Sequence, residues 1–466
     1  MFVISSTPWS KGKIVSSIHK TKTVPALKRS PQDAVYRKIS VRLLPFLLLL
    51  YTFAYLDRVN IGFAKLQMSA DIGLSEAAYG LGAGLFFLGY VLFEVPSNLL
   101  LVKIGIKKTI MRIMCLWGLT SAAMAFVQNE TAFYVLRTLL GVFEAGFAPG
   151  IIFYLTYWYS TKRMAGAMGI YMLAGPLGSM IGGPVSAFIL SSTHGFGGLA
   201  GWQWVFLIEG LPCLVMVFFV WKFLHDSPKQ AKWLTPAEKE ILEHDIAASD
   251  AEDTSGGRSG AHSFRVVLRD PKVYALSFGY FALISGIYAI SFWLPTILKD
   301  NGITSILQVG WLTAVPYALA IIAMVMLGLS SDRTRERKWH IAVPSALAAA
   351  GLLTAAFTSS NFMVSFLGLV IATVCVWGAY TVFWSLPAAH LKGSAAAGGI
   401  ALINSIGLLG GFISPYIIGI IKDATGSTQY GLVFIVILVV AGALVLFRTQ
   451  SGRKLPVIPA VNRQEN

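Results

Sequence analysis

Charged residues are scarce in this sequence. Only 13% of its 466 residues are Asp, Glu, Lys or Arg, whereas a soluble domain carries about 25%. Hydrophobic residues make up 55% of the chain, and the mean hydropathy is +0.67. Apolar runs long enough to cross a bilayer, which takes about 20 helical residues, recur along the chain. This composition excludes an ordinary soluble domain and predicts an all-α polytopic membrane protein.

Cysteine and histidine are also sparse. Cys115, Cys213 and Cys375 lie in three different apolar runs, no CxxC sequence is present, and the seven histidines are scattered across the loops. Neither a disulfide framework nor a metal site is indicated, and we expect no cofactor. We predict that the protein is not an enzyme, with a polytopic membrane enzyme or sensor as the alternative from another class.

Apolar runs between charged clusters predict twelve transmembrane helices in two six-helix halves, the arrangement of many secondary transporters. The predicted spans are 41–64, 76–100, 108–127, 131–153, 164–191, 202–224, 271–298, 307–330, 340–360, 362–388, 395–421 and 429–447.

Lys and Arg are distributed unequally between the loops on the two sides of the predicted membrane. The net charge is +15, and the loops on one predicted side carry only Lys65, Lys299 and Lys422. Because loops rich in Lys and Arg stay inside, both termini are predicted to be cytoplasmic. The membrane topology therefore explains the excess of positive charge, and no nucleic-acid partner is expected.

The spans divide the chain into five segments. A polar interval in the middle is predicted to be a flexible cytoplasmic linker. It contains a short predicted helix capped at Thr235, with Pro236 at its first position and Glu238 three residues after the cap. The expected segments are a basic N-terminal tail over 1–40, a six-helix half over 41–224, the linker over 225–270, a second half over 271–447 and a tail over 448–466.

Ionisable residues inside the spans occur only in the first half. They are Asp57, Arg58, Glu94, Arg137, Glu144 and Glu209. An ionised group at bilayer depth costs at least about 2.5–3.5 kcal/mol and normally faces a bundle interior or a water-filled path.

Two arginines fall at a similar depth. Arg58 and Arg137 each lie about six residues below the outer surface, and Glu144 follows Arg137 by seven residues on the same helix face. We expect one guanidinium to neutralise Asp57 and the other to be free for an anion. The alternative is that these four residues only form structural bridges between two helices. For Glu94 and Glu209 a structural role is favoured.

Several strings carry a family resemblance. They are Tyr55-Leu56-Asp57-Arg58-Val59-Asn60-Ile61-Gly62, Tyr90 with FEVPSN, the segment LRTLLGVFEAG over 136–146, Gly201-Trp202-Gln203-Trp204 and Asn404-Ser405-Ile406-Gly407. On these the chain resembles the major facilitator superfamily over residues 36–450. More narrowly it resembles the anion:cation symporter family, whose bacterial members carry tartrate, phthalate, hydroxyphenylacetate, nicotinate and sugar acids.

The resemblance implies alternating access between two halves, driven by protons. It also implies the following roles: proton coupling by Asp57 and Glu144, substrate binding by Arg58, Tyr55, Tyr90, Asn404 and Trp384, a supporting ion pair from Arg137, and gating by Asp332 and Arg333. The acidic residue that the superfamily places in the basic turn after span 2 is missing from LLLVKIGIKK, which puts gate contacts of the first half in doubt.

We therefore predict import of a small organic anion by proton symport, by a monomer in the bacterial cytoplasmic membrane. Exchange or export is the alternative within transport. Gly175-Pro176 and Gly182-Gly183-Pro184 are similar to an antiporter signature, but the paired glycine after the second proline is missing.

Overall fold

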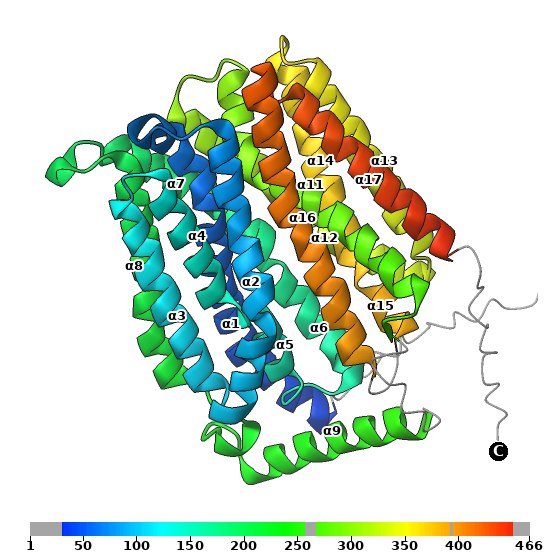
Figure 1. Cartoon of the computed structure of the whole chain (residues 1–466). Coiled ribbons are helices and arrows are strands. Elements are labelled where there is room, and N and C mark those ends of the chain that lie inside the picture. Colours follow the sequence, from blue (N-terminus) through cyan, green and yellow to red (C-terminus); the bar gives the residue numbers. More distant parts are fainter. Residues whose placement is uncertain (1–29, 257–266, 392–394, 451–466) are drawn as a thin grey trace, which may run out of the picture.

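The computed structural model describes residues 30–256, 267–391 and 395–450, and within these ranges the regular structure is helical with no strand. Twelve helical segments are long and apolar enough to cross a membrane, which confirms the predicted fold class. They form two bundles side by side (Figure 1).

The first six spans contain eight α-helices, because two of the spans are broken. They are α1 (Pro31–Ile72), α2 (Glu76–Ile104), α3 (Ile106–Ala123), α4 (Glu130–Glu144), α5 (Phe147–Leu155), α6 (Thr161–Met172), α7 (Ala174–Ser192) and α8 (Gly201–Phe223).

The last six spans follow α9 (Pro236–Gly256). They are formed by α11 (Pro271–Asp300), α12 (Ile306–Thr334), α13 (Lys338–Phe357), α14 (Phe362–Phe383), α15 (Ser385–His390), α16 (Ala395–Thr425) and α17 (Gln429–Gln450).

Span 4 breaks directly after Glu144, where one continuous helix was expected. Gly146 has a φ of 85°, a left-handed conformation that glycine adopts without strain. A Cβ atom at this position would lie 2.6 Å from the Ser97 hydroxyl oxygen, so α2 also crosses too closely for any side chain here. Glu144 is therefore the last residue of α4.

Proline accounts for the other two breaks. Pro176 has no N–H to donate to the carbonyl four residues earlier, at Met172, where α6 ends. In the same way Pro387 cannot donate to the carbonyl of Phe383, where α14 ends. Both breaks follow from the sequence, although hydropathy alone predicts continuous spans.

The two halves pack on each other through α2 against α16, α7 against α12 and α1 against α11. We call the ends away from α9 the outer ends, as the loop charges predict. There a Cβ atom on Gly80 would lie 2.3 Å from the carbonyl oxygen of Pro415, and one on Gly419 would lie 2.3 Å from that of Glu76. By contrast α6, which continues α7 toward α9, packs mainly on α1, α5, α7 and α9 of its own side. The two halves are therefore in closer contact at the outer ends than along α6.

The interval expected to be a flexible linker begins with a docked helix. α9 lies across the end of the first bundle (Figure 1), and its expected cap is present, with the backbone N–H of Thr235 donating to Glu238 over 2.8 Å. The Tyr36 hydroxyl donates to Asp245 over 2.6 Å, and the Lys38 ammonium lies 2.7 Å from Glu238. The hydrogen bond from Lys38 lowers the pKa of Glu238 below its ordinary value, so this contact stays ionic at neutral pH.

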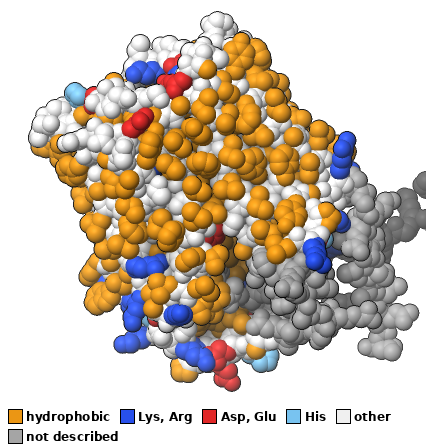
Figure 2. Space-filling model, viewed as in Figure 1, with side chains coloured by type: hydrophobic (Ala, Val, Ile, Leu, Met, Phe, Trp, Pro, Cys, Tyr) orange, Lys and Arg blue, Asp and Glu red, His pale blue; other side chains and the backbone are white. Residues whose placement is uncertain are grey.

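Hydrophobic side chains cover the middle of the molecule, and most charged side chains lie beyond the edges of this band (Figure 2). This band is the part of the described surface that we expect to face lipid.

Candidate functional site

Arg58 lies at the centre of the bundle and contacts both halves. Its side chain is only 5% exposed, and Nη1 donates to the hydroxyl of Tyr288, on α11, over 2.7 Å. Its Nη2 pairs with Glu144, from α4. The guanidinium therefore connects two helices of the first half with one of the second.

Aromatic rings surround this guanidinium. Its carbon lies 4.9 Å from the ring centroid of Tyr55, 5.1 Å from that of Phe86 and 5.8 Å from that of Tyr90. A cation within about 6 Å of a ring is attracted by the ring quadrupole. The structure thus brings the expected substrate residues Tyr55 and Tyr90 to Arg58.

Glu144 is 1% exposed and uses one carboxylate oxygen for Arg58. The other oxygen, Oε2, is buried and has no hydrogen-bond partner in the described part of the chain. Because the helix breaks after this residue, the carboxylate lies at a helix end rather than within a continuous span. The unpartnered oxygen of Glu144 is therefore free to accept a further hydrogen bond.

Asp57 points away from Arg58, as expected for adjacent helical residues about 100° apart. It accepts hydrogen bonds from Trp117 Nε1 over 2.6 Å, from the Ser121 hydroxyl and from Asn60 Nδ2 over 3.4 Å. Trp117 and Ser121 lie four residues apart on one face of α3. This polar pair in an apolar helix is a signal that the sequence prediction missed.

Arg137 forms no ion pair within 4 Å in the described residues, so the expected supporting pair with Asp57 or Glu144 is absent. Its Nε and Nη2 instead donate to the carbonyl oxygens of Gly82 and Ala83, each over 3.3 Å. The small side chains of Gly82 and Ala83 let the guanidinium reach the backbone of α2. Meanwhile Asp57 accepts its hydrogen bonds from Trp117, Ser121 and Asn60 instead.

Asn404 contacts the other half through Glu94. Its Nδ2 donates to Glu94 Oε1 over 2.9 Å, and Glu94 lies one helical turn from Tyr90 toward the α9 end of α2. Glu94, for which a structural role was favoured, therefore joins the halves at the wall of the site. Its Oε2 has no hydrogen-bond partner among the described residues.

Trp384 makes no hydrogen bond or cation–π contact with Arg58 among the described residues. Its ring packs edge-on against Tyr280, with centroids 4.9 Å apart, and Tyr280 precedes Tyr288 by two turns of α11. Trp384 thus belongs to an aromatic cluster on the α9 side of Arg58.

The expected gating residues lie at the surface. The Asp332 carboxylate is 2.7 Å from Arg337 Nη2 within the turn after α12, and Arg333 is exposed. In the first half, the acid missing after span 2 is supplied from elsewhere. Asp226, which follows α8, accepts a hydrogen bond from the backbone N–H of Lys107 over 2.9 Å at the first turn of α3.

A charged network closes the outer end. Lys65 pairs with Glu76 of α2, and Lys422 of α16 lies 3.3 Å from Glu76 and 2.9 Å from Asp300 of α11. Asp423 accepts hydrogen bonds from the backbone N–H groups of Glu76 and Ala77 over 3.0 and 2.8 Å.

Lys65, predicted as a loop residue, lies in α1 and is 5% exposed. These contacts join the two halves and seal Arg58 from the outer side.

Twelve membrane-spanning helices in two bundles, with an ion pair buried at the centre, are typical of a multi-pass membrane transporter. Such a protein has a small-molecule substrate and is not an enzyme. The chain belongs to the Major Facilitator Superfamily, whose sequence profile matches residues 47–415.

Relatives and solved structures agree with this assignment. A protein of Agrobacterium vitis named as a tartrate transporter is 48% identical over 421 residues, which cover 90% of this chain and 92% of that protein. A quinolone resistance transporter of Acinetobacter baumannii is 40% identical over 432 residues, covering 92% and 98%. The similarity to the first is consistent with a permease of the anion:cation symporter type.

The fold is shared with a bacterial homologue of the human lysosomal transporter Spinster, crystallised in an inward-facing, unoccupied conformation. The TM-score is 0.70 at 19% identity, and the match covers 90% of this chain and 97% of that one. Together with the twelve spans, these bacterial relatives place the protein in the inner membrane as a multi-pass protein.

Proposed function

We propose that the protein imports a small organic anion together with protons by alternating access. The observation that carries this proposal is the buried pair of Arg58 and Glu144. A cation that binds a carboxylate of the protein has the right chemistry to bind a carboxylate of a substrate, and its planar fork does so with two hydrogen bonds.

Competition for Arg58 supplies the coupling. A proton on Glu144 removes the negative charge that holds the guanidinium, and Arg58 then binds the substrate carboxylate. Loss of that proton to the cytoplasm restores the ion pair with Arg58 and displaces the substrate. Proton and anion thus cross in the same direction. When the protons outnumber the charges on the substrate, the membrane potential adds about 2.3 kcal/mol per net charge per 100 mV.

The aromatic surroundings favour a compact substrate. Tyr55, Phe86 and Tyr90 lie around the guanidinium, and Asn404 and Glu94 offer amide and carboxyl groups one turn away. These groups suit a carboxylate with a ring or with hydroxyl groups, and the relative named as a tartrate transporter fits this chemistry. Asp57 is a second proton site in this proposal, held within the first half.

Topology and assembly are part of the same proposal. Both termini and α9 face the cytoplasm, in agreement with the basic loops, and the protein acts as a monomer, since each half supplies its part of the site within one chain.

Export is the second candidate, favoured by the relative named as a quinolone resistance transporter. It uses the same site with the opposite coupling, in which a proton enters as the organic anion leaves. Aromatic rings around a cation suit a planar aromatic acid equally well, so the direction has to be measured.

Proteoliposomes test both candidates. Purified protein is assayed with labelled hydroxy dicarboxylates, aromatic monocarboxylates and a quinolone, with the external pH below, equal to or above the internal pH. Symport predicts that external acid drives accumulation of at least one carboxylate above its external concentration. Accumulation only when the inside is acidic would favour exchange or export. If none of the tested organic acids shows counterflow, the proposal is refuted.

A further inference from the structure

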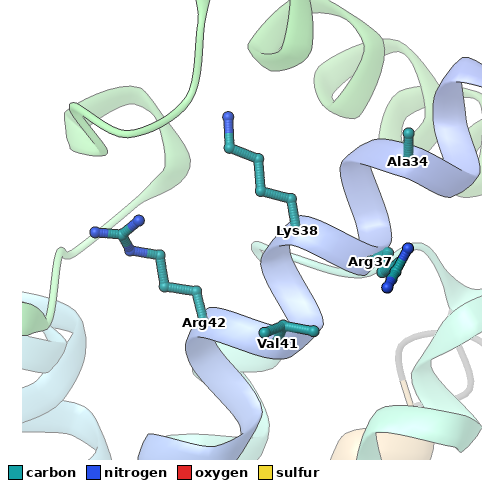
Figure 3. A pocket seen from close by; sticks show the side chains of 5 residues that line it. All are labelled: Ala34, Arg37, Lys38, Val41 and Arg42. Atoms are coloured by element: carbon teal, nitrogen blue, oxygen red, sulfur yellow. The ribbon is translucent and has the colours of Figure 1, made fainter.

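The cytoplasmic end of α1 carries a pocket of about 560 Å³ outside the substrate site. We call it the α1 basic pocket, and it is lined by Ala34, Arg37, Lys38, Val41 and Arg42. Figure 3 shows Val41 between the cations, with Lys38 and Arg42 pointing to one side of the helix and Arg37 to the other. We propose that the α1 basic pocket binds the head group of an anionic phospholipid of the cytoplasmic leaflet.

The face of α1 that forms the pocket continues into the membrane as an apolar surface. Val41 and Leu49 are 69% and 43% exposed, and Pro45 between them is exposed as well. Residues four apart lie on the same face of a helix, so these three form one stripe that acyl chains cover. Arg37 lies one turn beyond Val41 on this stripe, at the level where a head group follows its acyl chains.

The neighbouring end of α8 lies beside this stripe. Trp221 and Phe223 are 56% and 51% exposed there, and the ring of Phe223 lies 6.2 Å from that of Phe46 on α1. Tryptophan gathers at membrane interfaces, where one end of its ring is apolar and the other is wet. Lys222, next to Trp221, is exposed and adds a further cation near the interface.

The charges of the pocket are not balanced within the described chain. Lys38 is bound by both carboxylate oxygens of Glu238, whereas neither Arg37 nor Arg42 has an ion-pair partner within 4 Å in the described ranges. Arg42 instead lies over the ring of Trp233, 5.2 Å from its centroid.

The other acids packed near this end of α1 are already engaged. Asp33 pairs with Arg163, and Asp245 accepts from Tyr36. Two arginines are thus left for outside anions: Arg37 on the lipid-facing stripe and Arg42 on the other side of the helix (Figure 3). A phosphodiester matches the planar guanidinium fork, and basic pockets on the cytoplasmic side of membrane proteins bind anionic head groups.

The site differs from the substrate site in position, so it stands whether or not the proposed transport is correct. The test uses the full-length protein in detergent and native mass spectrometry. Dioleoyl phosphatidylglycerol is added in steps, with dioleoyl phosphatidylcholine as the neutral lipid of equal chain length. We expect the wild-type protein to retain phosphatidylglycerol in preference to phosphatidylcholine.

Two charge variants separate the pocket from general surface charge. Each cation near an anionic surface strengthens binding by a factor of about five, so the Arg37→Ala/Arg42→Ala variant should bind phosphatidylglycerol about thirtyfold less tightly. The control Lys103→Ala/Lys108→Ala removes the same charge from exposed residues outside the pocket and should stay within about twofold of wild type, because surface charges away from a site are screened within a Debye length.

Three results would overturn the proposal. One is equal binding of the two lipids, and another is an equal loss in both double variants. The third is displacement of phosphatidylglycerol by millimolar glycerol 3-phosphate, which would assign the pocket to a soluble phosphate. Thermal unfolding of each variant in detergent without added lipid shows whether the arginine variant is folded. If it is not, Arg37→Gln/Arg42→Gln keeps the side-chain length and should show the same loss.

Discussion

Arg58 of α1 and Glu144 of α4 form an ion pair at the centre of the bundle, with exposed fractions of 5% and 1%. Burying a single charge costs far more than burying a paired one, so each group stabilises the other only while both are ionised. Anything that neutralises Glu144 leaves Arg58 in need of a new anion. In the proposed mechanism the pair links a proton site to an anion site through direct contact.

Substitution of Arg58 tests the anion site. Arg58→Lys keeps the charge but loses the fork and one hydrogen bond, and we expect substrate affinity to fall about tenfold. Arg58→Ala removes the anchor and should lower it by about 100-fold or more. Binding is measured by substrate protection against thermal unfolding of the purified variants.

Arg112→Lys is the matched control for these variants, since Arg112 donates to Ser97 within the first half and its replacement should leave affinity unchanged. If a folded Arg58→Ala protein binds substrate with wild-type affinity, Arg58 has a structural role only.

Topology is tested by two single cysteines introduced into a background without the three native ones. The side chain of Lys229 is 78% exposed beside α9, and Lys299 is exposed at the opposite end of the molecule. In intact cells a membrane-impermeant maleimide should label Lys299→Cys and leave Lys229→Cys unlabelled until the cells are lysed. The reverse pattern would invert the proposed orientation.

The sequence predicts the twelve spans well because hydropathy and loop charge are local properties of the chain. It also predicts which ionisable residues are buried, with the exception of Lys65. It does not predict the partners, because these come from helices far away in the chain. Asp57 meets α3 rather than Arg137, and Arg58 meets Tyr288 of the other half. The break after Glu144 also has a local signal, because Pro149 has no N–H to donate to the carbonyl of Ala145, the residue that follows α4.

The outer network should bias the protein toward the inward-facing state. Lys422→Met removes the contacts with both Glu76 and Asp300. Partly exposed ion pairs contribute about 1 kcal/mol or less, so the outward-facing population should rise by about two- to fivefold. Thr313, 4% exposed on α12 where it faces α7, reports this opening when replaced by cysteine and labelled from outside.

Lys299→Met serves as the control for that variant, because it removes the same charge from an exposed position at the outer end. Equal labelling rates at residue 313 in the two variants would show that the network does not hold the outer end closed.

Replacement of Glu144 separates coupling from structure. Glu144→Gln is neutral and nearly isosteric, and so resembles the protonated carboxyl permanently. Arg58 then stays available to the substrate in both orientations of the carrier. We expect counterflow of labelled substrate to continue at a rate within about tenfold of wild type, because the fold and the anchor remain, while accumulation driven by a pH gradient is lost. A purely structural bridge predicts otherwise, since breaking a buried pair leaves an uncompensated charge and costs about 3–5 kcal/mol, which would lower stability and both activities together.

The control is Glu209→Gln, a buried acid of α8 that accepts a hydrogen bond from Ser186 over 2.6 Å within the first half and should keep both activities. Both assays are run in the same proteoliposomes, and pH-driven accumulation by a folded Glu144→Gln protein would exclude Glu144 as the coupling site.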